Sequence, residues 1–450
     1  MMDQLFSTFD SISEEDWKAR IAQDLKGTTF DDLIYTDRNG IRIQPFYTFS
    51  ETTKLVKPVF THTDWEITVN INVDGNEAAA NKAALEALNG GATALKFETT
   101  ESVDLPKLLK NIDLCAIMTQ FVPKGSLQVF LNHFDDYLAA FGMLSDRLDC
   151  YVMSDPISHY NTQSAFRKSV IAENWEVFNS CRIGHKTITV CAEMYQNAGA
   201  TPMYELACTI AHLNEYLNVL QESNALNRVE KILICVAVDT HFFEQIAKLR
   251  ALRILISSLI EHYDIAIPVH IQAITSDVYR TPIDPYSNLL RDTIAGMAGI
   301  LGGCNSLIIH RFDANIRMPN EFSDRLSRNQ QLIFKEESHL QRIADVAHGA
   351  YFIESMTRQL AEQAWIAFQA IERVGGWLEA CKKNIPQKTI HQQREELLAR
   401  YKDGTKVLTG INKYQYTEES KEELNFPKAK ENAAFPALNI ARALLKNSEK

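Results

Sequence analysis

Residues 231–274 read KILICVAVDTHFFEQIAKLRALRILISSLIEHYDIAIPVHIQAI and contain the repeating unit of the fold. Two short apolar runs, 231–238 and 269–274, have the length and the β-branched composition of buried strands. Between them, residues 242–260 carry apolar side chains at helical spacing. This order predicts a βαβ unit, in which the two strands run parallel.

The same alternation extends in both directions along the chain. Strands are predicted at 66–73, 94–98, 114–121, 148–153, 187–192, 231–238, 269–274 and 306–310. Helices are predicted between them at 77–88, 105–112, 134–144, 163–178, 203–221, 242–260 and 286–301. Eight strand–helix units in about 250 residues predict an α/β fold of the (β/α)8 TIM-barrel type. The alternative is an open doubly wound sheet, but no Gly-rich phosphate-binding turn follows the first predicted strand.

Further segments flank the predicted barrel, which we place at 51–320. Residues 1–50 are predicted to form an N-terminal arm with one helix, N-capped by Ser13, followed by extended segments. Residues 321–405 are predicted to be a helical region, with helices at 321–337, 351–374 and 391–401. Residues 406–450 are predicted to be a C-terminal tail that ends in a short amphipathic run, 437–445.

The composition excludes several classes of protein. The 450 residues include 57 acidic and 46 basic side chains, so the net charge is −11, which argues against binding to nucleic acid or to an anionic membrane. No apolar run is long enough to span a bilayer, and the N-terminus lacks the features of a signal peptide. The eight cysteines show no C-x-x-C spacing. Together these features predict a cytoplasmic protein with reduced thiols and no metal site.

Common cofactor motifs are missing from the sequence. It has no P-loop, no G-x-G-x-x-G, no H-E-x-x-H and no G-x-S-x-G. One segment, 239–244, nearly matches the D-x-H-x-x-G loop that ligates cobalt in cobalamin-binding domains, but Glu244 replaces its glycine. Asp239 also fits the carboxyl end of a barrel strand. We therefore expect this segment to belong to the barrel and not to a cobalamin site.

Three specific motifs occur in order between residues 283 and 376. The first, D-P-Y-x-N-x-x-R, is matched by Asp284, Pro285, Tyr286, Asn288 and Arg291. The second, F-S-x-R-x-x-R-N-x-Q-L, is matched by Phe322, Ser323, Arg325, Arg328, Asn329, Gln331 and Leu332. The third is carried by Glu336, Glu337 and Ser338, followed by residues 350–354. This stretch resembles the barrel region of the methylmalonyl-CoA mutase family.

Other segments extend the resemblance over nearly the whole chain. Residues 24–27 and 40–48 are similar to the N-terminal arm of the family, residues 196–201 to its Q-E-A-G-A element, and residues 410–414 to its G-V-N-x-Y element. The resemblance implies a (β/α)8 barrel, an acyl-CoA substrate that runs down the barrel, and radical chemistry carried by adenosylcobalamin.

The chain departs from the family at the positions that carry the chemistry. Aligned on Trp65, Phe60 occupies the position of an active-site tyrosine, and Met194 occupies the position of a histidine that polarises the thioester. No cobalamin-binding domain follows the barrel before Lys450. We therefore expect no catalytic residue and no bound cofactor in this chain. Gln196, Asn288, Arg291, Asn329 and Gln331 are candidates for substrate contacts retained as relics.

These departures lead to three hypotheses. In the first, the chain is the non-catalytic small subunit of a heterodimeric methylmalonyl-CoA mutase, whose large catalytic subunit holds the adenosylcobalamin and is contacted by the arm, 1–50. In the second, it is an active acyl-CoA mutase barrel whose cobalamin domain is a separate chain. In the third, it is an acyl-CoA-binding regulatory protein. The loss of both the tyrosine and the histidine favours the first.

Overall fold

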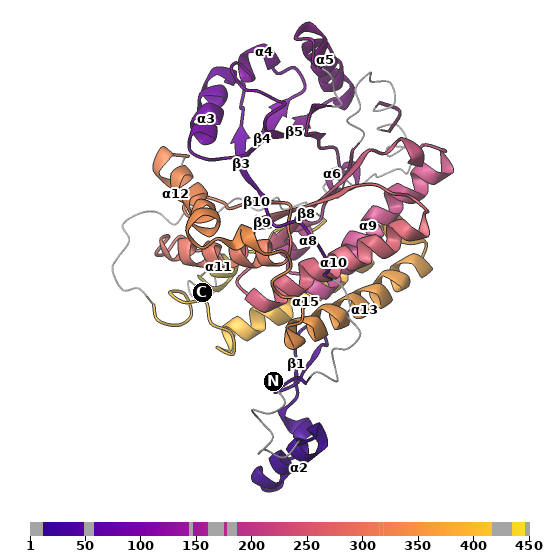
Figure 1. Ribbon diagram of the computed structural model, residues 1–450, viewed down its shortest axis with the longest axis vertical. Helices are drawn as coiled ribbons and strands as arrows, with labels where there is room; N and C mark the ends of the chain where they lie inside the picture. The colour runs from indigo at the N-terminus through magenta and orange to yellow at the C-terminus, as the bar shows by residue number, and fades with distance from the viewer. Residues whose placement is uncertain are drawn as a thin grey trace, which may run out of the picture.

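The computed structural model describes residues 12–48, 58–143, 147–160, 175–177, 187–314, 316–317, 319–415 and 434–445. Its centre is a sheet of eight parallel strands in the order β6-β5-β4-β3-β10-β9-β8-β7 (Figure 1). The strands are β3 Glu66–Asn72, β4 Ala94–Thr100, β5 Met118–Lys124, β6 Cys150–Val152, β7 Thr187–Cys191, β8 Lys231–Val238, β9 Val269–Thr275 and β10 Ser306–Ile308.

The first and last strands of the barrel pair with each other. Ser306 of β10 is in register with Glu66 of β3, and Leu307 with Ile67. Such pairing closes a barrel and does not occur in a doubly wound sheet, so the predicted (β/α)8 fold is confirmed. The barrel is nearly closed, because β6 and β7 form no ladder with each other in the described part of the chain.

Helices surround the strands, as the alternation predicts. They are α3 Glu77–Asn89, α4 Leu105–Leu108, α5 Leu127–Ala140, α6 Pro156–Tyr160, α8 Glu193–Ala198, α9 Pro202–Glu222, α10 Phe242–His262 and α11 Ser287–Leu301. Most of the helix predicted at 163–178 lies outside the described residues. The strand predicted from 114 begins at Met118, because Asp113 first forms a turn by accepting from the backbone N–H of Cys115. Helix α5 begins before the predicted residue 134, because Ser126 caps it.

A second layer of helices packs outside the barrel. It contains α12 Glu321–Leu332, the π-helical turn Ile333–Glu337, α13 Tyr351–Arg373, α14 Gly376–Lys382, α15 Ile385–Lys402 and α16 Ile440–Leu445. Helix α13 lies along α9 and α10 (Figure 1). It is held there by Arg250 of α10, which is fully buried and pairs with Asp345 and Glu354. A buried ion cluster of this kind strongly constrains packing, since losing one partner leaves an unpaired charge.

The N-terminal arm has two parts with different surroundings. Its helix α2, Glu14–Asp24, is capped by Ser13, contains no buried residue and lies at the end of the molecule away from α3, α4 and α5 (Figure 1). The hairpin of β1 Tyr35–Thr36 and β2 Arg42–Ile43 follows it. This hairpin packs on the chain's own barrel layer, because Ile41 is fully buried and Asn39 bonds to Glu244 of α10. Among the described residues, no helix is long and apolar enough to cross a membrane.

Candidate functional site in the barrel interior

The barrel interior is lined by alternate residues of the eight strands. Part of this lining is an apolar cluster of Ala94, Met118, Tyr151, Met153, Leu233, Cys235, Ile274 and Ile308. Several inward positions next to this cluster are polar. Buried polar groups cost free energy unless they find hydrogen-bond partners, so their partners indicate how the interior is filled.

A chain of hydrogen bonds crosses the interior. The Tyr151 hydroxyl lies 3.4 Å from Nδ1 of His270, and Nε2 of His270 lies 2.7 Å from Oγ of Ser306. Nε2 of Gln272 donates to Oγ of Ser306 at 3.1 Å and to Oε1 of Gln120 at 3.0 Å. Gln120 is on β5 and Gln272 on β9, which are four strands apart in a ring of eight. This bond therefore spans the barrel.

Burial keeps His270, the histidine in this run of hydrogen bonds, neutral. It lowers the pKa of His270 to about 4, and the nearby cations Arg253 and Lys231 act in the same direction against the opposing charge of Asp149. A neutral imidazole donates from one nitrogen and accepts at the other, as contacts with Tyr151 and Ser306 require. These hydrogen bonds are made between the protein's own side chains, and Nε2 of Gln120 is left without a partner among the described residues.

Two charged side chains, Lys96 and Glu193, also belong to the barrel interior. Lys96 of β4 is in register with Gln120 and so faces inward, and Glu193 follows β7. Burial raises the pKa of Glu193 to about 7, and Lys96 opposes that shift. Burial alone would lower the pKa of Lys96, but Cys235, Glu193 and other neighbours raise it on balance. The two charges therefore influence each other electrostatically, while Oε2 of Glu193 makes no hydrogen bond within the described part of the chain.

Asp155 joins the two strands that do not pair. It follows β6, and its Oδ2 accepts from the backbone N–H of Cys191 in β7 at 2.7 Å. Its Oδ1 accepts from the Tyr216 hydroxyl at 2.7 Å and lies 3.0 Å from Nε2 of His212, both on α9. Burial raises the pKa of Asp155, but His212 and these hydrogen bonds lower it below its usual value on balance. The carboxylate thus bridges the seam between β6 and β7.

The tail covers part of the same end of the barrel. The backbone N–H of Leu438 donates to the carbonyl of Asn197, and that of Ile440 donates to the carbonyl of Val278 beyond β9. Phe435 packs edge-on against Tyr195, with ring centroids 5.3 Å apart. The amphipathic run predicted at 437–445 therefore packs on this chain, beside the loops that follow β7 and β9.

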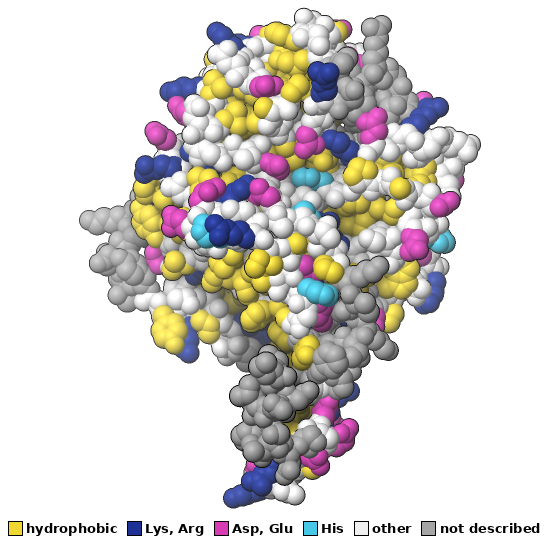
Figure 2. All heavy atoms as spheres, in the orientation of Figure 1, with side chains coloured by type: hydrophobic (Ala, Val, Ile, Leu, Met, Phe, Trp, Pro, Cys, Tyr) yellow, Lys and Arg dark blue, Asp and Glu magenta, His cyan; other side chains and the backbone are white. Residues whose placement is uncertain are grey.

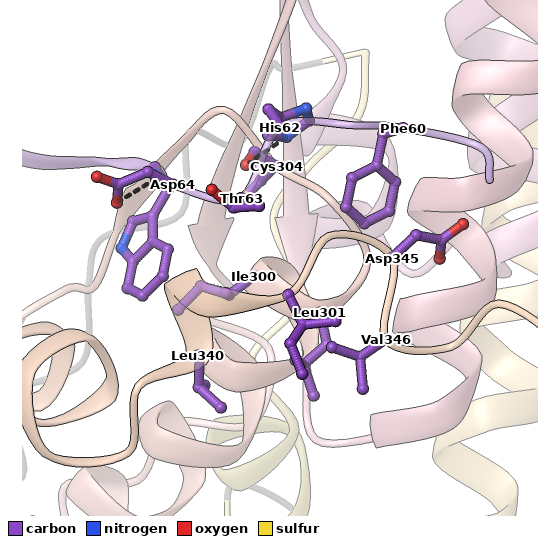
Figure 3. Close-up of a pocket in the computed structure, with 12 residues that line it drawn as sticks. Phe60, His62, Thr63, Asp64, Ile300, Leu301, Cys304, Leu340, Asp345 and Val346 are labelled. Carbon is purple, nitrogen blue, oxygen red and sulfur yellow. Dashed lines mark hydrogen bonds between the residues drawn. The ribbon is translucent and has the colours of Figure 1, made fainter.

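The two positions expected to have lost catalytic groups lie at opposite ends of the barrel. Phe60 precedes β3 and packs on Gly303, where an added Cβ would lie 2.5 Å from the ring. Figure 3 shows the Phe60 ring beside the loop that carries Asp345 and Val346. The pocket there is about 10 Å³, which leaves room for about one water molecule. Met194 follows the carboxyl end of β7, so the structure does not bring these two residues into one site.

Gln196 is held by internal hydrogen bonds on both sides of its amide. Its Nε2 donates to Oδ2 of Asp239 at 2.8 Å, and its Oε1 accepts from Nζ of Lys248. Lys248 also pairs with Glu205 at 2.8 Å, and burial raises the pKa of Glu205 to about 7. The amide therefore links α8 to β8 and α10.

Three other candidates lie outside the barrel, on α11 and α12. The amide of Asn288 bonds to the backbone of Thr281 and Phe312, and Arg291 donates to Asn288 and to the Thr409 carbonyl. Gln331 accepts from the indole N–H of Trp65 and donates to the Leu307 carbonyl.

Asn329 is half-buried on α12. The five candidates are thus spread over three regions of the fold and do not converge on one ligand.

The segment that resembles a cobalt-ligating loop does not fit that role. Nδ1 of His241 lies 3.1 Å from Oδ1 of Asp239, and its Nε2 lies 2.9 Å from Nζ of Lys406. Both ring nitrogens are therefore engaged within the chain. Within the described residues, no group of three or more His, Cys, Asp or Glu side chains is arranged to hold a metal ion.

Sequence reasoning missed the interior chain and the Asp155 bridge. The sequence did indicate a polar barrel interior, because otherwise apolar predicted strands are interrupted by Lys96, Gln120, His270 and Gln272. Alternation along these strands places the four side chains inside the barrel. The partners across the barrel depend on register, which only the structure supplies.

Comparison with known families matches residues 62–443 to the family described as methylmalonyl-CoA mutase. The chain belongs to this family. The methylmalonyl-CoA mutase small subunit of Porphyromonas gingivalis is 29% identical over 418 residues, which cover 86% of this chain and 67% of that protein.

Two further relatives show the range of the family. A probable methylmalonyl-CoA mutase small subunit of Mycobacterium bovis is 31% identical, with coverage of 78% and 59%. The mitochondrial methylmalonyl-CoA mutase of Bos taurus is 27% identical, with coverage of 90% and 61%. The chain spans about half to two thirds of the length of the curated relatives it matches.

The Asp155 bridge leads to a pH-dependent prediction. Its pKa in the folded state is lowered, so its stabilisation is complete at neutral pH and is lost as the pH falls below about 4. Asp155→Asn should lower the free energy of unfolding by about 3 kcal/mol at pH 7, because it replaces a buried carboxylate that contacts Cys191, His212 and Tyr216. The difference from wild type should narrow below about pH 4.

The matched control is Asp149→Asn, which removes an exposed carboxylate beside β6 that pairs with Lys231. An exposed pair contributes less than about 1 kcal/mol, so this variant should unfold like wild type. Urea denaturation across pH 3–8 measures both variants. Equal destabilisation by the two substitutions, or a constant loss for Asp155→Asn at all pH values, would contradict the bridging role.

Proposed function

We propose that this chain is the small subunit of a heterodimeric methylmalonyl-CoA mutase and that it is not itself catalytic. In the holoenzyme, the large subunit would bind adenosylcobalamin and interconvert methylmalonyl-CoA and succinyl-CoA. Relatives from Porphyromonas gingivalis and Mycobacterium bovis carry the small-subunit designation, which supports this assignment. We propose a cytoplasmic location for the complex, since its large subunit would act on dissolved acyl-CoA.

One observation carries the non-catalytic assignment: the barrel is filled by its own side chains. The family resemblance implies that acyl-CoA runs down the barrel, and the bond between Gln120 and Gln272 lies across that route. Lys96, in register with Gln120, and Glu193 add two charged side chains to the interior. Admitting a pantetheine chain would break these contacts and leave buried polar groups without partners, at about 1–3 kcal/mol each.

The role left to such a chain is to stabilise its partner. A protein that binds only the folded catalytic chain stabilises it by mass action, and an obligate subunit interface makes the two stabilities inseparable. The arm is suited to this role, because Ile12, Trp17 and Tyr35 expose 73%, 41% and 57% of their surfaces.

The first test addresses catalysis. The isolated chain with adenosylcobalamin should not interconvert the two acyl-CoA esters. In the heterodimer reconstituted with the large subunit, Lys96→Met and Glu193→Gln should leave turnover within about twofold of wild type, because neither side chain meets substrate. A hundredfold loss in either variant, with the complex intact on size-exclusion chromatography, would show that this barrel has its own active site.

The second test addresses the arm. Deleting residues 1–33 removes α2 but keeps Asn39 and Ile41, so the barrel should melt at an unchanged temperature while affinity for the large subunit falls. Deleting residues 1–48 is the control: it also removes the buried Ile41, which should lower stability by about 1.5–3 kcal/mol. Calorimetry and surface plasmon resonance measure the two effects. Unchanged affinity after deletion of residues 1–33 would place the interface elsewhere.

A further inference from the structure

Helix α11 exposes only apolar side chains. Within Ser287–Leu301, the exposed residues are Leu290 at 69% and Ile294 at 42%, and Tyr286, the N-cap, is 54% exposed. These three residues follow at intervals of four, so they form one stripe along the helix. The charged residues of α11 do not interrupt it, because Asp292 is buried and Arg291 is tied to Thr409.

Other barrel helices do not share this property. Helix α3, on the same barrel, exposes Lys82, Glu86 and Asn89 together with alanines. Helices α9 and α10 are apolar, but α13 covers them. The outer face of a solvent-exposed helix is normally polar, so the large apolar residues exposed on α11 indicate that another molecule covers this face.

Neighbouring segments extend the stripe on one side. The Phe312 ring stacks on Tyr286 with centroids 5.0 Å apart and meets Phe322 of α12 edge-on at 6.3 Å. The side-chain amide of Gln330 donates to the Leu289 carbonyl at 2.8 Å, which sets the end of α12 along the middle of α11. Ile333, one turn beyond Gln330, is 45% exposed.

The loop before α13 extends the stripe at the other end of the helix. Ile343 and Val346 are 65% and 51% exposed and line the same small pocket as Ile300 and Leu301 of α11 (Figure 3). We define the α11 face as Tyr286, Leu290, Ile294, Phe322, Ile333, Ile343 and Val346. Figure 2 shows hydrophobic side chains gathered over α11.

The size of the α11 face matches a protein interface. With aromatic side chains of about 150–250 Å² and aliphatic ones somewhat smaller, the exposed fractions leave roughly 700 Å² of apolar surface. The largest apolar patch on a typical monomer is about 300–600 Å². A standard interface takes about 800 Å² from each partner.

We propose that the α11 face is the surface on which the barrel of the large subunit docks, through its own corresponding helix. The proposal rests on the proposed function. Relatives designated as small subunits and relatives designated simply as mutases both match this barrel. We infer from this that a large subunit of the same family has a helix equivalent to α11. Two homologous chains pair most readily through the same patch on each, about a pseudo-twofold axis. An apolar face of this size fits such a permanent interface.

The first experiment compares two double variants for binding to the large subunit. Leu290→Glu with Ile294→Glu places charges in the α11 face, and the matched control Val129→Glu with Phe141→Glu places them on two residues of α5 that are 36% and 57% exposed. The α11 variant should bind at least a hundredfold more weakly, while the control binds like wild type. Circular dichroism and thermal melts of the isolated chains show whether each variant is folded.

A second readout keeps the proposal testable if the α11 variant fails to fold. A photo-crosslinking phenylalanine at position 290 of the otherwise wild-type chain should link to the corresponding helix of the large subunit. Links to residues 416–433 of the same chain, or to a second copy, would overturn the proposal by identifying a different occupant. If wild type and the α11 variant both bind the large subunit tightly, the α11 face is not the docking surface, and the proposed function still stands. Failure of wild type to bind the large subunit would overturn the proposed function itself.

Discussion

The hydrogen bond between Gln120 and Gln272 is the constraint on which the function of this barrel depends. It joins strands β5 and β9, on opposite sides of the ring, at 3.0 Å. Ser306, His270 and Tyr151 continue this run of hydrogen bonds. Breaking one of these bonds would leave a buried polar group without a partner, as Nε2 of Gln120 already is among the residues that the structure describes. These contacts support our proposal that the barrel is packed as a core and is not a substrate channel.

If the barrel does not admit substrate, the functional regions of the chain must lie on its outer surfaces. At the carboxyl ends of the strands, where barrel enzymes place their chemistry, Glu193 follows β7 and the chain's own tail packs on the loops after β7 and β9. Phe60 and Met194 lie at opposite ends and form no common site. Large exposed hydrophobic side chains occur instead on helix α2, at Trp17, and on the α11 face. The α11 face is apolar, whereas α2 exposes Trp17 among charged residues such as Glu15 and Arg20. Exposed apolar side chains of this kind are expected of a subunit that binds a partner.

The sequence predicted the fold better than the site, for physical reasons. Periodicity and strand length are local properties, so the eight strands and most flanking helices were predictable. Asp113 and Ser126 moved the starts of β5 and α5. In addition, α4 ends at Leu108, α15 begins at Ile385, and α14 was not predicted. Family motifs located Gln196, Asn288, Arg291 and Gln331, but motifs do not reveal that these side chains bond within the chain. The interior network and the Asp155 bridge depend on which strands lie opposite each other. Register and ring closure decide that, and neither is local in sequence.

The most direct test of this account is an equilibrium measurement of acyl-CoA binding to the isolated chain. Isothermal titration with succinyl-CoA, with a single-chain methylmalonyl-CoA mutase as the positive control, measures whether the barrel admits substrate. The account predicts no saturable binding to wild type up to millimolar ligand, because the bond between Gln120 and Gln272 blocks the barrel axis. Micromolar binding that Gln272→Leu alters would contradict it, since the barrel would then open to ligand.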